Sequence, residues 1–564
     1  MTKKVLCILI LIFTALLMLT SCASKGEGEQ IVVPLDKQTE YLDPQIVWEN
    51  GAKNIIANCF EGLVTYDSEG SIVPAACESY TISDNGLVYT FNLRTDGRWR
   101  VPTLAKETIL DYYKGEAEYN YDTDFDLRVT ADDFIFALQR VFTPETKCPY
   151  APSLMNIKNA QKIYEGKKHP SSLGVKKEGE YKLVITLEKA DSEFLSSLTL
   201  PACMPCNEEF FEITKGHYGL YTNYLIFNGP FYISNWSEKT AITARRNEYY
   251  RATEEELRSS EVSSADIVKP QSVYFSFNNE QETRDRKIKD GTYEMAPITK
   301  EQVKPFLNNK KYTVNTVRSS VTSIILNCSD AVLSNKKLRK AIVGTVDREV
   351  LTSYFGKENA MGIVPSASLA GSKSYRSQVG SIEKIRVSDV LARELFKEAV
   401  EILEVNDIEL TVLCSANNET AVRGLIQKWQ SIFGASFNIS VEAVENNELS
   451  GKISSGEYQI ALCDIAYTDA TALNALARYK GGARDNIVNY SSAAYDRLIS
   501  EISDSKTEKQ RLKALVKAEN YLMEGCALVP VCEEEVYYVM GAGVSGIIFS
   551  PTGEVAYYKS ALSK

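Results

Sequence analysis

The spacing of apolar residues predicts helices and strands that alternate along the whole chain. Bulky apolar residues occupy every second position from Leu87 to Leu93, directly after Asp84-Asn85-Gly86, which predicts a β-hairpin. From Thr130 onward the apolar residues recur at helical spacing instead, with Asp132 and Asp133 in the first turn, where the helix dipole favours acids. Further helices are expected at 54–63, 338–351, 392–403, 421–433, 495–502 and 508–523, and further strands at 31–43, 181–187, 273–277, 408–414, 527–531 and 536–539. This alternation predicts an α/β protein with mixed sheets.

The segment from Gln459 to Asn474 is a candidate ligand site. It begins as an apolar run and then carries Asp464, Tyr467 and Asp469 through a turn. Such a run can place polar side chains at the mouth of a cleft, but it also fits a buried strand followed by a solvated loop. These residues alone leave both interpretations open.

The N-terminus predicts export and lipid anchoring. Lys3 and Lys4 precede an apolar run over 5–19, which is too short for a stable transmembrane helix and is typical of a secretory signal. Leu19-Thr20-Ser21-Cys22 resembles a bacterial lipobox, so we expect cleavage after residue 21 and a lipid on Cys22. An ordinary signal peptide with a chance cysteine is the alternative. Residues 22–30 are then a flexible tether, and the protein lies outside the cytoplasm on a membrane surface.

Composition restricts the possible partners. The chain has 63 Lys and Arg against 74 Asp and Glu, a net charge of −11, and it has no basic block, which argues against nucleic acid. It has no Gly-rich phosphate loop, no nucleophile elbow, no H-E-x-x-H and only His169 and His217. We therefore expect a protein that is not an enzyme and needs no cofactor. The 564 residues are too many for one core, so two or three domains are expected.

The twelve cysteines do not form the framework of a small disulfide-rich domain. Cys203 and Cys206 form one C-x-x-C, and Cys526 and Cys532 are another close pair. A zinc site would need more ligands at defined spacing, and His217 is the nearest one. Local disulfides and unpaired structural thiols both remain open, and we expect no metal.

A series of short motifs occurs in a fixed order along nearly the whole mature chain. The first part contains Asp43-Pro44, Phe60-Glu61-Gly62-Leu63, Pro74, Ser83-Asp84-Asn85-Gly86, Tyr89–Arg94, Trp99 and Thr130-Ala131-Asp132-Asp133-Phe134. The later part contains Asn228-Gly229-Pro230-Phe231-Tyr232, Trp236, Arg246–Tyr250, Leu338-Arg339-Lys340-Ala341, Val346-Asp347-Arg348, Asn489-Tyr490, Tyr495–Leu498 and Leu528-Val529-Pro530. This ordered set resembles the peptide-binding proteins of ABC importers, which are extracytoplasmic solute-binding proteins of family 5.

The resemblance implies a large two-lobed fold of the periplasmic-binding-protein type (class II, three domains) with a ligand cleft between the lobes. It assigns the first lobe to residues 31–45, 176–270 and 487–564, an extra domain to 46–175, and the second lobe to 271–486. The segment 254–268, charged and rich in serine, is expected to connect the lobes. The polar segment between Trp99 and Val129 is longer than the usual turn of the family, and we expect an exposed insertion or flap there.

The resemblance also implies how a ligand is held. Members of the family pair an extended peptide backbone with strands of both lobes, which provides affinity that does not depend on side chains. By position, the first lobe contributes Thr39, Glu40 and Tyr41, and the turn Cys148–Ala151 contributes Tyr150. The second lobe contributes Ala461, Leu462 and Cys463, followed by Asp464, Tyr467 and Asp469. The usual Ala-Asp-Tyr-x-Asp/Glu-Pro run, whose acid binds the peptide amine, is here Ala466-Tyr467-Thr468-Asp469-Ala470 and lacks the first acid.

The predicted function is therefore a lipid-anchored, monomeric receptor that captures oligopeptides for the permease of an ABC importer. The same fold also allows a nickel chelate, an oligosaccharide or a signalling peptide as the ligand. A peptide-processing enzyme or a structural lipoprotein is the alternative of a different class. The sequence does not define peptide length, side-chain preference or the partner permease.

Overall fold

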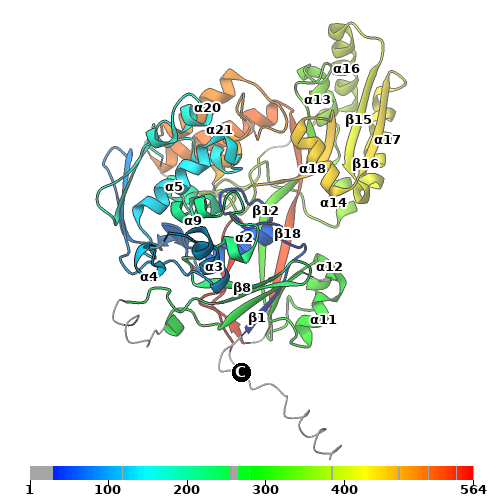
Figure 1. Cartoon of the computed structure of the whole chain (residues 1–564). Coiled ribbons are helices and arrows are strands. Elements are labelled where there is room, and N and C mark those ends of the chain that lie inside the picture. The colour runs from blue at the N-terminus through cyan, green and yellow to red at the C-terminus, as the bar shows by residue number, and fades with distance from the viewer. Residues whose placement is uncertain are drawn as a thin grey trace, which may run out of the picture.

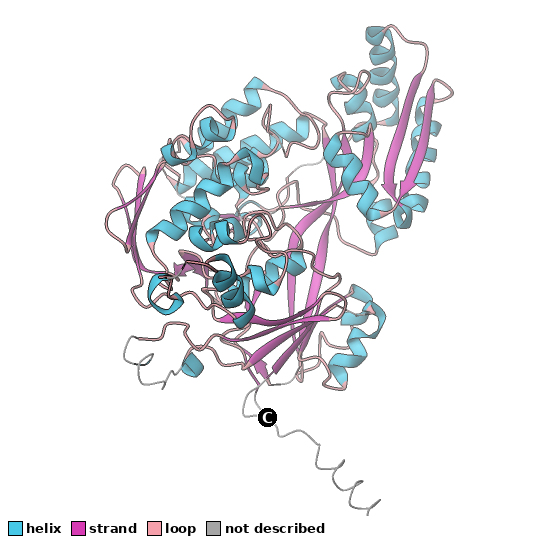
Figure 2. Ribbon diagram, in the orientation of Figure 1, coloured by secondary structure: helices cyan, strands magenta, loops and turns pink. Residues whose placement is uncertain are grey.

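The computed structural model describes residues 30–562 except 117, 192, 254–255, 257–263, 278–279, 372, 383–384, 468–470, 484, 506 and 542. Helices and strands are mixed throughout this part of the chain (Figure 2), which confirms the predicted α/β class. Cys22 and the expected signal and tether, apart from residue 30, lie outside the described residues.

Two four-stranded sheets form within the first half of the chain. The first has the order β1-β10-β9-β8, with β1 parallel to β10 and the other pairs antiparallel. Its strands are β1 (Gln30–Pro34), β8 (Phe231–Ser237), β9 (Ala241–Arg246) and β10 (Ser272–Ser276). The second has the order β4-β5-β7-β6 and contains the predicted hairpin. Its strands are β4 (Cys77–Ile82), β5 (Val88–Leu93), β6 (Val175–Lys177) and β7 (Lys182–Thr186).

A six-stranded mixed sheet with the order β11-β18-β12-β17-β15-β16 forms from the second half. Its strands are β11 (Met295–Ile298), β12 (Thr313–Leu326), β15 (Ile408–Ser415), β16 (Phe437–Val444), β17 (Ile460–Ala466) and β18 (Leu528–Met540). The two short strands expected at 527–531 and 536–539 are thus parts of one long strand, β18. Four two-stranded ribbons complete the described strands: β2 (Val64–Tyr66) with β3 (Ile72–Pro74), β13 (Leu369–Ala370) with β14 (Lys373–Ser374), β19 (Val544–Ser545) with β22 (Ala561–Leu562), and β20 (Ile548–Phe549) with β21 (Val555–Ala556).

The helices surround these sheets (Figure 1). Up to residue 213 they are α2 (Asn50–Cys59), α3 (Thr103–Tyr112), α4 (Tyr121–Asp124), α5 (Ala131–Phe142), α6 (Ala151–Leu154), α7 (Ala160–Tyr164), α8 (Phe194–Ser197) and α9 (Glu208–Ile213). Later ones are α11 (Arg284–Lys289), α12 (Lys300–Val303), α13 (Lys336–Gly344), α14 (Arg348–Phe355), α15 (Tyr375–Val379), α16 (Asp389–Leu403), α17 (Glu419–Phe433), α18 (Asn446–Ser455), α19 (Ala472–Ala477), α20 (Ala493–Ser503) and α21 (Glu508–Glu524). The helix expected over 338–351 is two helices, because Asp347 accepts hydrogen bonds from the N–H groups of Glu349 and Val350 and so caps a new start.

Hydrophobic packing separates two bodies. One continuous core runs through residues 31–277 and also includes Met295, Met540, Val555 and Tyr557, so the four-stranded sheets share it, and a small core of residues 288–306 with Tyr537 and Val539 lies beside β1. Two other cores lie on the opposite faces of the six-stranded sheet. Helices α19, α20 and α21 cover one face, and α13, α16 and α17 cover the other.

The packing leads us to propose lobe limits that differ from those suggested by the family resemblance. Residues 493–532 bury their apolar side chains against the six-stranded sheet, whereas the sequence interpretation assigned them to the first lobe. We propose a first lobe of residues 30–317 and 536–562 and a second lobe of 320–534, because 288–306 and 537–540 pack with β1 and the first core. The segment 254–268 joins β9 to β10, which pair within one sheet, so it does not connect the lobes; residues 254–255 and 257–263 of it lie outside the described part.

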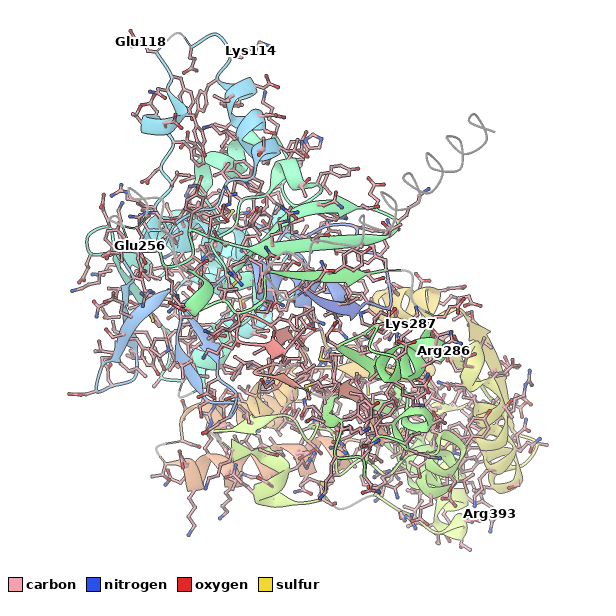
Figure 3. The ribbon with its side chains drawn as sticks, turned by 90° about the horizontal axis from the view of Figure 1, so that it is seen from below. Lys114, Glu118, Glu256, Arg286, Lys287 and Arg393 are labelled. Atoms are coloured by element: carbon pink, nitrogen blue, oxygen red, sulfur yellow. The ribbon has the colours of Figure 1, made fainter. Side chains whose placement is uncertain are left out.

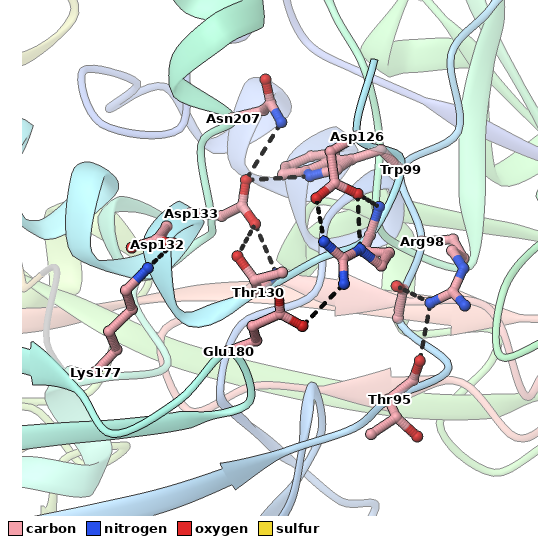
Figure 4. Close-up of polar contacts among 12 residues, drawn as sticks. Thr95, Arg98, Trp99, Asp126, Thr130, Asp132, Asp133, Lys177, Glu180 and Asn207 are labelled. Atoms are coloured by element: carbon pink, nitrogen blue, oxygen red, sulfur yellow. Dashed lines mark hydrogen bonds and ion pairs between the residues drawn. The ribbon is translucent and has the colours of Figure 1, made fainter. Parts of the chain in front are cut away.

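The start of α5 shows how a local sequence signal becomes tertiary structure (Figure 4). Thr130 caps the helix as predicted, and its N–H donates to Asp133 Oδ2 at 2.7 Å in a capping box. The indole N–H of Trp99 donates to the other oxygen of Asp133 at 3.2 Å. Burial raises the pKa of Asp133 to about 7, even though these hydrogen bonds favour its charged form. One carboxylate therefore joins the helix to the strand-like segment of Trp99.

The expected insertion after Trp99 folds into α3 and α4. Lys114 and Glu118 lie at its outer end (Figure 3). Nearer the body, the rings of Tyr113 and Tyr119 stack with centroids 3.9 Å apart. The Tyr113 hydroxyl donates to Glu209 Oε1 on α9 at 2.8 Å, which fastens the base of the insertion to the first lobe.

Strands β12 and β18 form a long antiparallel ribbon that extends from the core of the second lobe to the edge of the first lobe (Figure 1). Its pairing register shifts between Val317 and Ser320 and again between Thr322 and Ser323. At the far end β18 pairs with β11, and the N–H of Val32 on β1 donates to Glu294 Oε2 at 2.9 Å. The irregularity between Val317 and Ser320 lies just before β12 begins to pair with β17, whereas the one at Thr322 and Ser323 lies within that pairing.

Candidate functional site

The first-lobe segment of the expected site is held firmly. Thr39 is buried, Glu40 is exposed and Tyr41 is half-buried, in irregular backbone after the end of β1. The guanidinium of Arg140 on α5 contacts both oxygens of Asp43, the nearer at 2.6 Å. The Leu42 N–H donates to Gly219 O at 2.7 Å. A Cβ on Gly219 would lie 2.5 Å from Asp43 N, so this close approach requires glycine.

Tyr150 lies at the start of α6 and is almost fully buried. Its hydroxyl has no hydrogen-bond partner among the described residues. Burial raises the pKa of Tyr150 well above its usual value, and the nearby Glu554, Cys148 and Tyr41 add to the shift. The structure thus brings Tyr150 near Tyr41 and leaves a buried hydroxyl that needs a partner.

The backbone of β17 is only partly available to a ligand. Ala461, Leu462 and Cys463 are buried, and β17 pairs with β12 along its whole length. Tyr467 N donates to Ser319 O on the β12 side at 3.2 Å, so odd-numbered residues of β17 direct their backbone groups to β12 and even-numbered ones direct them to the opposite edge. On that edge β15 pairs only with Ile460, Ala461 and Leu462.

An open strand edge therefore begins at Asp464. Pairing with β15 ends at Leu462, so among the described residues no strand accepts the N–H of Asp464 or of Ala466, or donates to the C=O of Asp464. The C=O of Ala466 is occupied, because Arg478 Nη1 donates to it at 2.9 Å. These free groups are what an extended ligand needs for strand addition. The backbone groups of Ala461 and Leu462 are already used in the pairing of β17 with β12 and β15.

Asp464 belongs to a carboxylate pair joined by one hydroxyl. Thr322 Oγ1 lies 2.7 Å from Asp464 Oδ1 and 2.8 Å from Glu534 Oε1. A hydroxyl has one hydrogen to donate, so one of the two carboxyl groups must donate a proton to Thr322 for both contacts to be hydrogen bonds. Lys357 forms an ion pair with Glu534. Although the Asp464 side chain is exposed to solvent at the strand edge, desolvation by the surrounding protein and the neighbouring Glu534 charge raise the pKa of Asp464.

Tyr467 lies in a cluster of aromatic rings around one cation. It is buried, and its hydroxyl lies 3.2 Å from that of Tyr479. The guanidinium of Arg478 lies 5.2 Å from the ring centroid of Tyr467 and 5.9 Å from that of Tyr479. Asp469 lies outside the described residues.

Two cavities lie between the lobes. One of about 550 Å³ has Pro152, Ser153 and Met155, just after Tyr150, on one side and residues 474–485 on the other. This volume is in the range of small-ligand sites. The other, of about 400 Å³, lies between residues 70–72 and 193–196 of the first lobe and residues 369–371 and 508–512 of the second. The turn of Tyr150 and the segment after Tyr467 thus face the same cavity.

Beside these cavities, side chains of the two lobes contact each other directly. Arg511 Nε on α21 lies 3.0 Å from Glu193 Oε1 of the first lobe, and Arg511 Nη2 lies 3.6 Å from Asp191 Oδ1. Asn474 Nδ2 donates to Ser197 Oγ at 3.4 Å. The lobes are therefore in contact around the cavities.

Sequence reasoning missed Thr322, Lys357, Glu534, Arg478 and Arg511. The run Glu533-Glu534-Glu535 within an apolar context was a detectable signal, because acids are rare inside sheets. The others come from distant parts of the chain, and no spacing rule connects them. The ten cysteines from Cys59 to Cys532 are unpaired, and the described residues contain no cluster of three or more potential metal ligands.

Comparison with known proteins identifies the class. Two lobes with mixed sheets and cavities between them are the architecture expected of a periplasmic-binding-protein-like fold. Residues 71–486 match the family described as bacterial extracellular solute-binding proteins, family 5 (middle part), and the chain belongs to this family. The family resemblance read from the sequence motifs is thereby confirmed.

Relatives match over nearly their whole length. The probable deoxycholate-binding periplasmic protein YgiS of Escherichia coli is 24% identical, covering 93% of this chain and 91% of its own. The periplasmic oligopeptide-binding protein OppA of Haemophilus influenzae is 24% identical, covering 90% and 88%. The substrate-binding domain of an oligopeptide ABC transporter from Bacillus anthracis superimposes with a TM-score of 0.75 at 24% identity, covering 96% and 99%. This likeness confirms the predicted two-lobed fold.

The relatives are binding proteins that act outside the cytoplasm, and their names describe no enzyme. Among the described helices, none combines the length and the apolar character needed to cross a bilayer.

Proposed function

We propose that this protein is a lipid-anchored extracytoplasmic receptor that captures oligopeptides between its lobes and delivers them to an ABC importer permease. Relatives named as oligopeptide-binding proteins support the ligand class. The proposal includes a lipid on Cys22, which serves as the membrane anchor, a monomeric receptor, and no catalytic turnover.

The observation that carries the proposal is the open edge of β17. Among the described residues no strand pairs with the N–H and C=O of Asp464 or the N–H of Ala466, and an edge of this kind binds an extended backbone whatever its side chains. A carrier for varied peptides needs this kind of affinity. Residues Thr39, Glu40, Tyr41 and Tyr150 form the opposite wall in this proposal, with the Tyr150 hydroxyl as a free hydrogen-bonding group.

The carboxylate pair provides a site for the peptide amine in place of the missing family acid. An ammonium group of the ligand that contacts Asp464 forms an ion pair with its carboxylate, next to Glu534. Glu534 remains paired with Lys357, so one net negative charge is left for the ligand. Asp469 stays a second candidate for the same role.

Native mass spectrometry of the protein purified from the cells that express it tests the ligand class, because a closed cleft retains its ligand. We expect peptide masses that disappear on partial unfolding and return with added peptide. A retained steroid acid, oligosaccharide or metal chelate would refute the peptide assignment. Incubation with the recovered peptides should show no conversion; loss of peptide with time would indicate an enzyme.

The lipid anchor has its own test. The Cys22→Ala variant should leave the membrane fraction and appear in soluble form, while peptide retention stays unchanged. Membrane retention of the variant would contradict anchoring through Cys22.

A further inference from the structure

Residues 284–311 carry net positive charge in an otherwise acidic protein. This segment, which contains α11, β11 and α12, has eight Lys and Arg against four Asp and Glu, a net charge of +4, whereas the whole chain carries −11. Four of its cations are exposed and form no ion pair within the described part of the chain: Arg286, Lys304, Lys310 and Lys311. We call these four residues the basic cluster. Charge of one sign gathered on one surface attracts a partner of the opposite sign.

The acids of the same segment do not cancel this charge. Asp285 Oδ2 is already paired with Lys289 Nζ at 2.9 Å. Glu294 is half-buried and accepts a hydrogen bond from β1. The other two acids, Asp290 and Glu301, are exposed and stand against four unpaired cations. The surface of the segment therefore keeps an excess of positive charge.

An exposed apolar side chain accompanies the basic cluster. Leu307 is 55% exposed and lies between Lys304 and Lys310 in the sequence. Its neighbour Phe306 is buried in the small core beside β1, which holds the segment in place. Cations around an exposed apolar residue are typical of surfaces that lie in the headgroup region of a membrane.

The basic cluster lies at the end of the molecule where the described chain begins. Elements β1, α11 and α12 lie together at the lower end in Figure 1, and Figure 3, seen from that end, shows Arg286 on α11. Met295 at the start of β11 pairs with Met540, which pairs with Thr313 at the start of β12. Since neighbouring strands are about 4.8 Å apart, Thr313 lies roughly 10 Å from Met295, and the last two lysines of the cluster come just before it.

The proposed anchor keeps this end near lipid. Eight residues, 22–29, separate Cys22 from Gln30, and even a fully extended chain of that length spans only about 28 Å. A single lipid anchor gives one contact with the membrane, and a basic patch beside it gives a second. Cations within about 8 Å of an anionic surface are attracted to it at physiological salt, so exposed lysines beside the tether can provide that second contact.

We propose that the basic cluster and Leu307 bind the anionic phospholipid headgroups of the membrane that carries the receptor, and so fix the orientation of the receptor on that membrane. This inference rests on the lipid anchor of the proposed function. A lipid surface, rather than a protein, is the partner that the anchor itself keeps beside these residues.

Lipidated mature protein inserted into vesicles tests the proposal. A fluorophore is attached to Asn308→Cys, next to the cluster, or to Val390→Cys on α16, with Cys328→Ser in both because Cys328 is the described cysteine that is not fully buried. A nitroxide on the lipid headgroups quenches fluorophores close to the bilayer surface. In phosphatidylcholine vesicles that contain about one-third phosphatidylglycerol, quenching at position 308 should be about three- to tenfold stronger than in phosphatidylcholine alone. The difference should vanish at about 1 M salt, and quenching at position 390 should not depend on lipid charge.

Two variants with the same loss of charge separate the cluster from the net charge of the protein. The first neutralises three lysines of the basic cluster and should lose the dependence on lipid charge: Lys304→Gln, Lys310→Gln and Lys311→Gln. The second neutralises three exposed cations of α16 and α17 and should preserve it: Arg393→Gln, Lys397→Gln and Lys428→Gln. All six side chains are exposed, so both variants should fold.

The outcomes distinguish this inference from the proposed function. Equal quenching at position 308 on both kinds of vesicle, with the protein still bound to them, would overturn the lipid contact and leave the receptor proposal intact. Protein that does not stay with the vesicles would contradict the lipid anchor and the inference that rests on it. Loss of peptide import in the first variant, without any dependence of quenching on lipid charge, would assign this face to the permease and overturn the lipid contact.

Discussion

Two buried arginine–carboxylate contacts differ in what they hold together. Within the second lobe, Glu519 accepts hydrogen bonds from both terminal nitrogens of Arg376, from the N–H groups of Ile363 and Val364, and from the Tyr375 hydroxyl. Between the lobes, Arg511 contacts Glu193 at 3.0 Å and Asp191 at 3.6 Å. The first network gives its carboxylate five donors, whereas the second joins Arg511 to two acids, and Gly371 N–H also donates to Glu193 Oε1 at 3.5 Å.

The difference reflects whether the contact must break. A carboxylate inside one lobe stays out of water throughout the life of the fold, so five donors compensate its desolvation. A pair between lobes returns to water whenever they separate, so a few bonds suffice. More hydrogen bonds at this boundary would stabilise the arrangement in which the lobes are in contact and would slow their separation.

The largest effect is expected from Glu519→Gln. The variant leaves Arg376 as an uncompensated buried charge, and breaking such a pair costs about 3–5 kcal/mol. Urea denaturation should show this loss in the free energy of unfolding. A double variant, Arg376→Met with Glu519→Leu, should recover most of it; an unrecovered loss would mean that the network does more than compensate its own charges.

A smaller and different effect is expected from Arg511→Gln. The free energy of unfolding should fall by less than for Glu519→Gln, because Arg511 and Glu193 share fewer hydrogen bonds, whereas a bound peptide should dissociate up to about tenfold faster, because the contact between the lobes is weakened. Stopped-flow displacement measures the rate. A loss of stability as large as that of Glu519→Gln would remove the distinction between the two networks.

A third carboxylate, Asp464, extends the comparison because we propose that the ligand itself compensates it. Its raised pKa means that the affinity for free-amine peptides should fall as the pH drops through that pKa, while N-acetylated peptides show no such change. The same shift gives stability that is present below the unfolded pKa of about 3.9 and is lost as the pH rises through the folded value. Asp464→Asn should therefore be more stable than the wild type at neutral pH and bind both peptides independently of pH. Glu534 and Lys357 are the charged groups that face this site.

The smallest effect is expected from Arg423→Gln, which removes an exposed i,i+4 pair with Glu419 on α17. Such pairs contribute about 0.5 kcal/mol or less. Thermal unfolding should be nearly unchanged, and peptide dissociation should match the wild type. This variant is the reference against which the effect of Arg511→Gln is judged.

The sequence predicted the local structure well where one signal dominated. The capping residues at Thr130 and the alternation over Leu87–Leu93 were sufficient to predict α5 and β5. Long amphipathic helices such as α17 were also found. The single helix expected at 338–351 was wrong. In the sequence Asp347 cannot be distinguished from any other surface acid, and apolar periodicity alone does not show that one helix ends and another begins at this residue.

The site could be predicted only as a region. Family order indicated the segment around Asp464, but which backbone groups remain free depends on where β15 stops, and that is a tertiary fact. Thr322, Lys357 and Glu534 meet Asp464 from three separate parts of the chain. The lobe limits could not be predicted from the sequence either. Helices α20 and α21 are amphipathic, so their apolar faces would fit the core of either lobe.

The two-stranded ribbon of β12 and β18 has a mechanical consequence. Hydrogen bonds across an antiparallel ribbon resist sliding of one strand along the other, so relative movement of the lobes must bend the ribbon rather than shear it. We expect bending at the irregularity between Val317 and Ser320, where the ladder with β18 is interrupted and pairing of β12 with β17 has not yet begun. A ribbon that bends at one place lets the lobes move only along one direction relative to each other. We therefore expect the open edge of β17 at Asp464 to return to the same position relative to Thr39–Tyr41 and Tyr150 each time the lobes close.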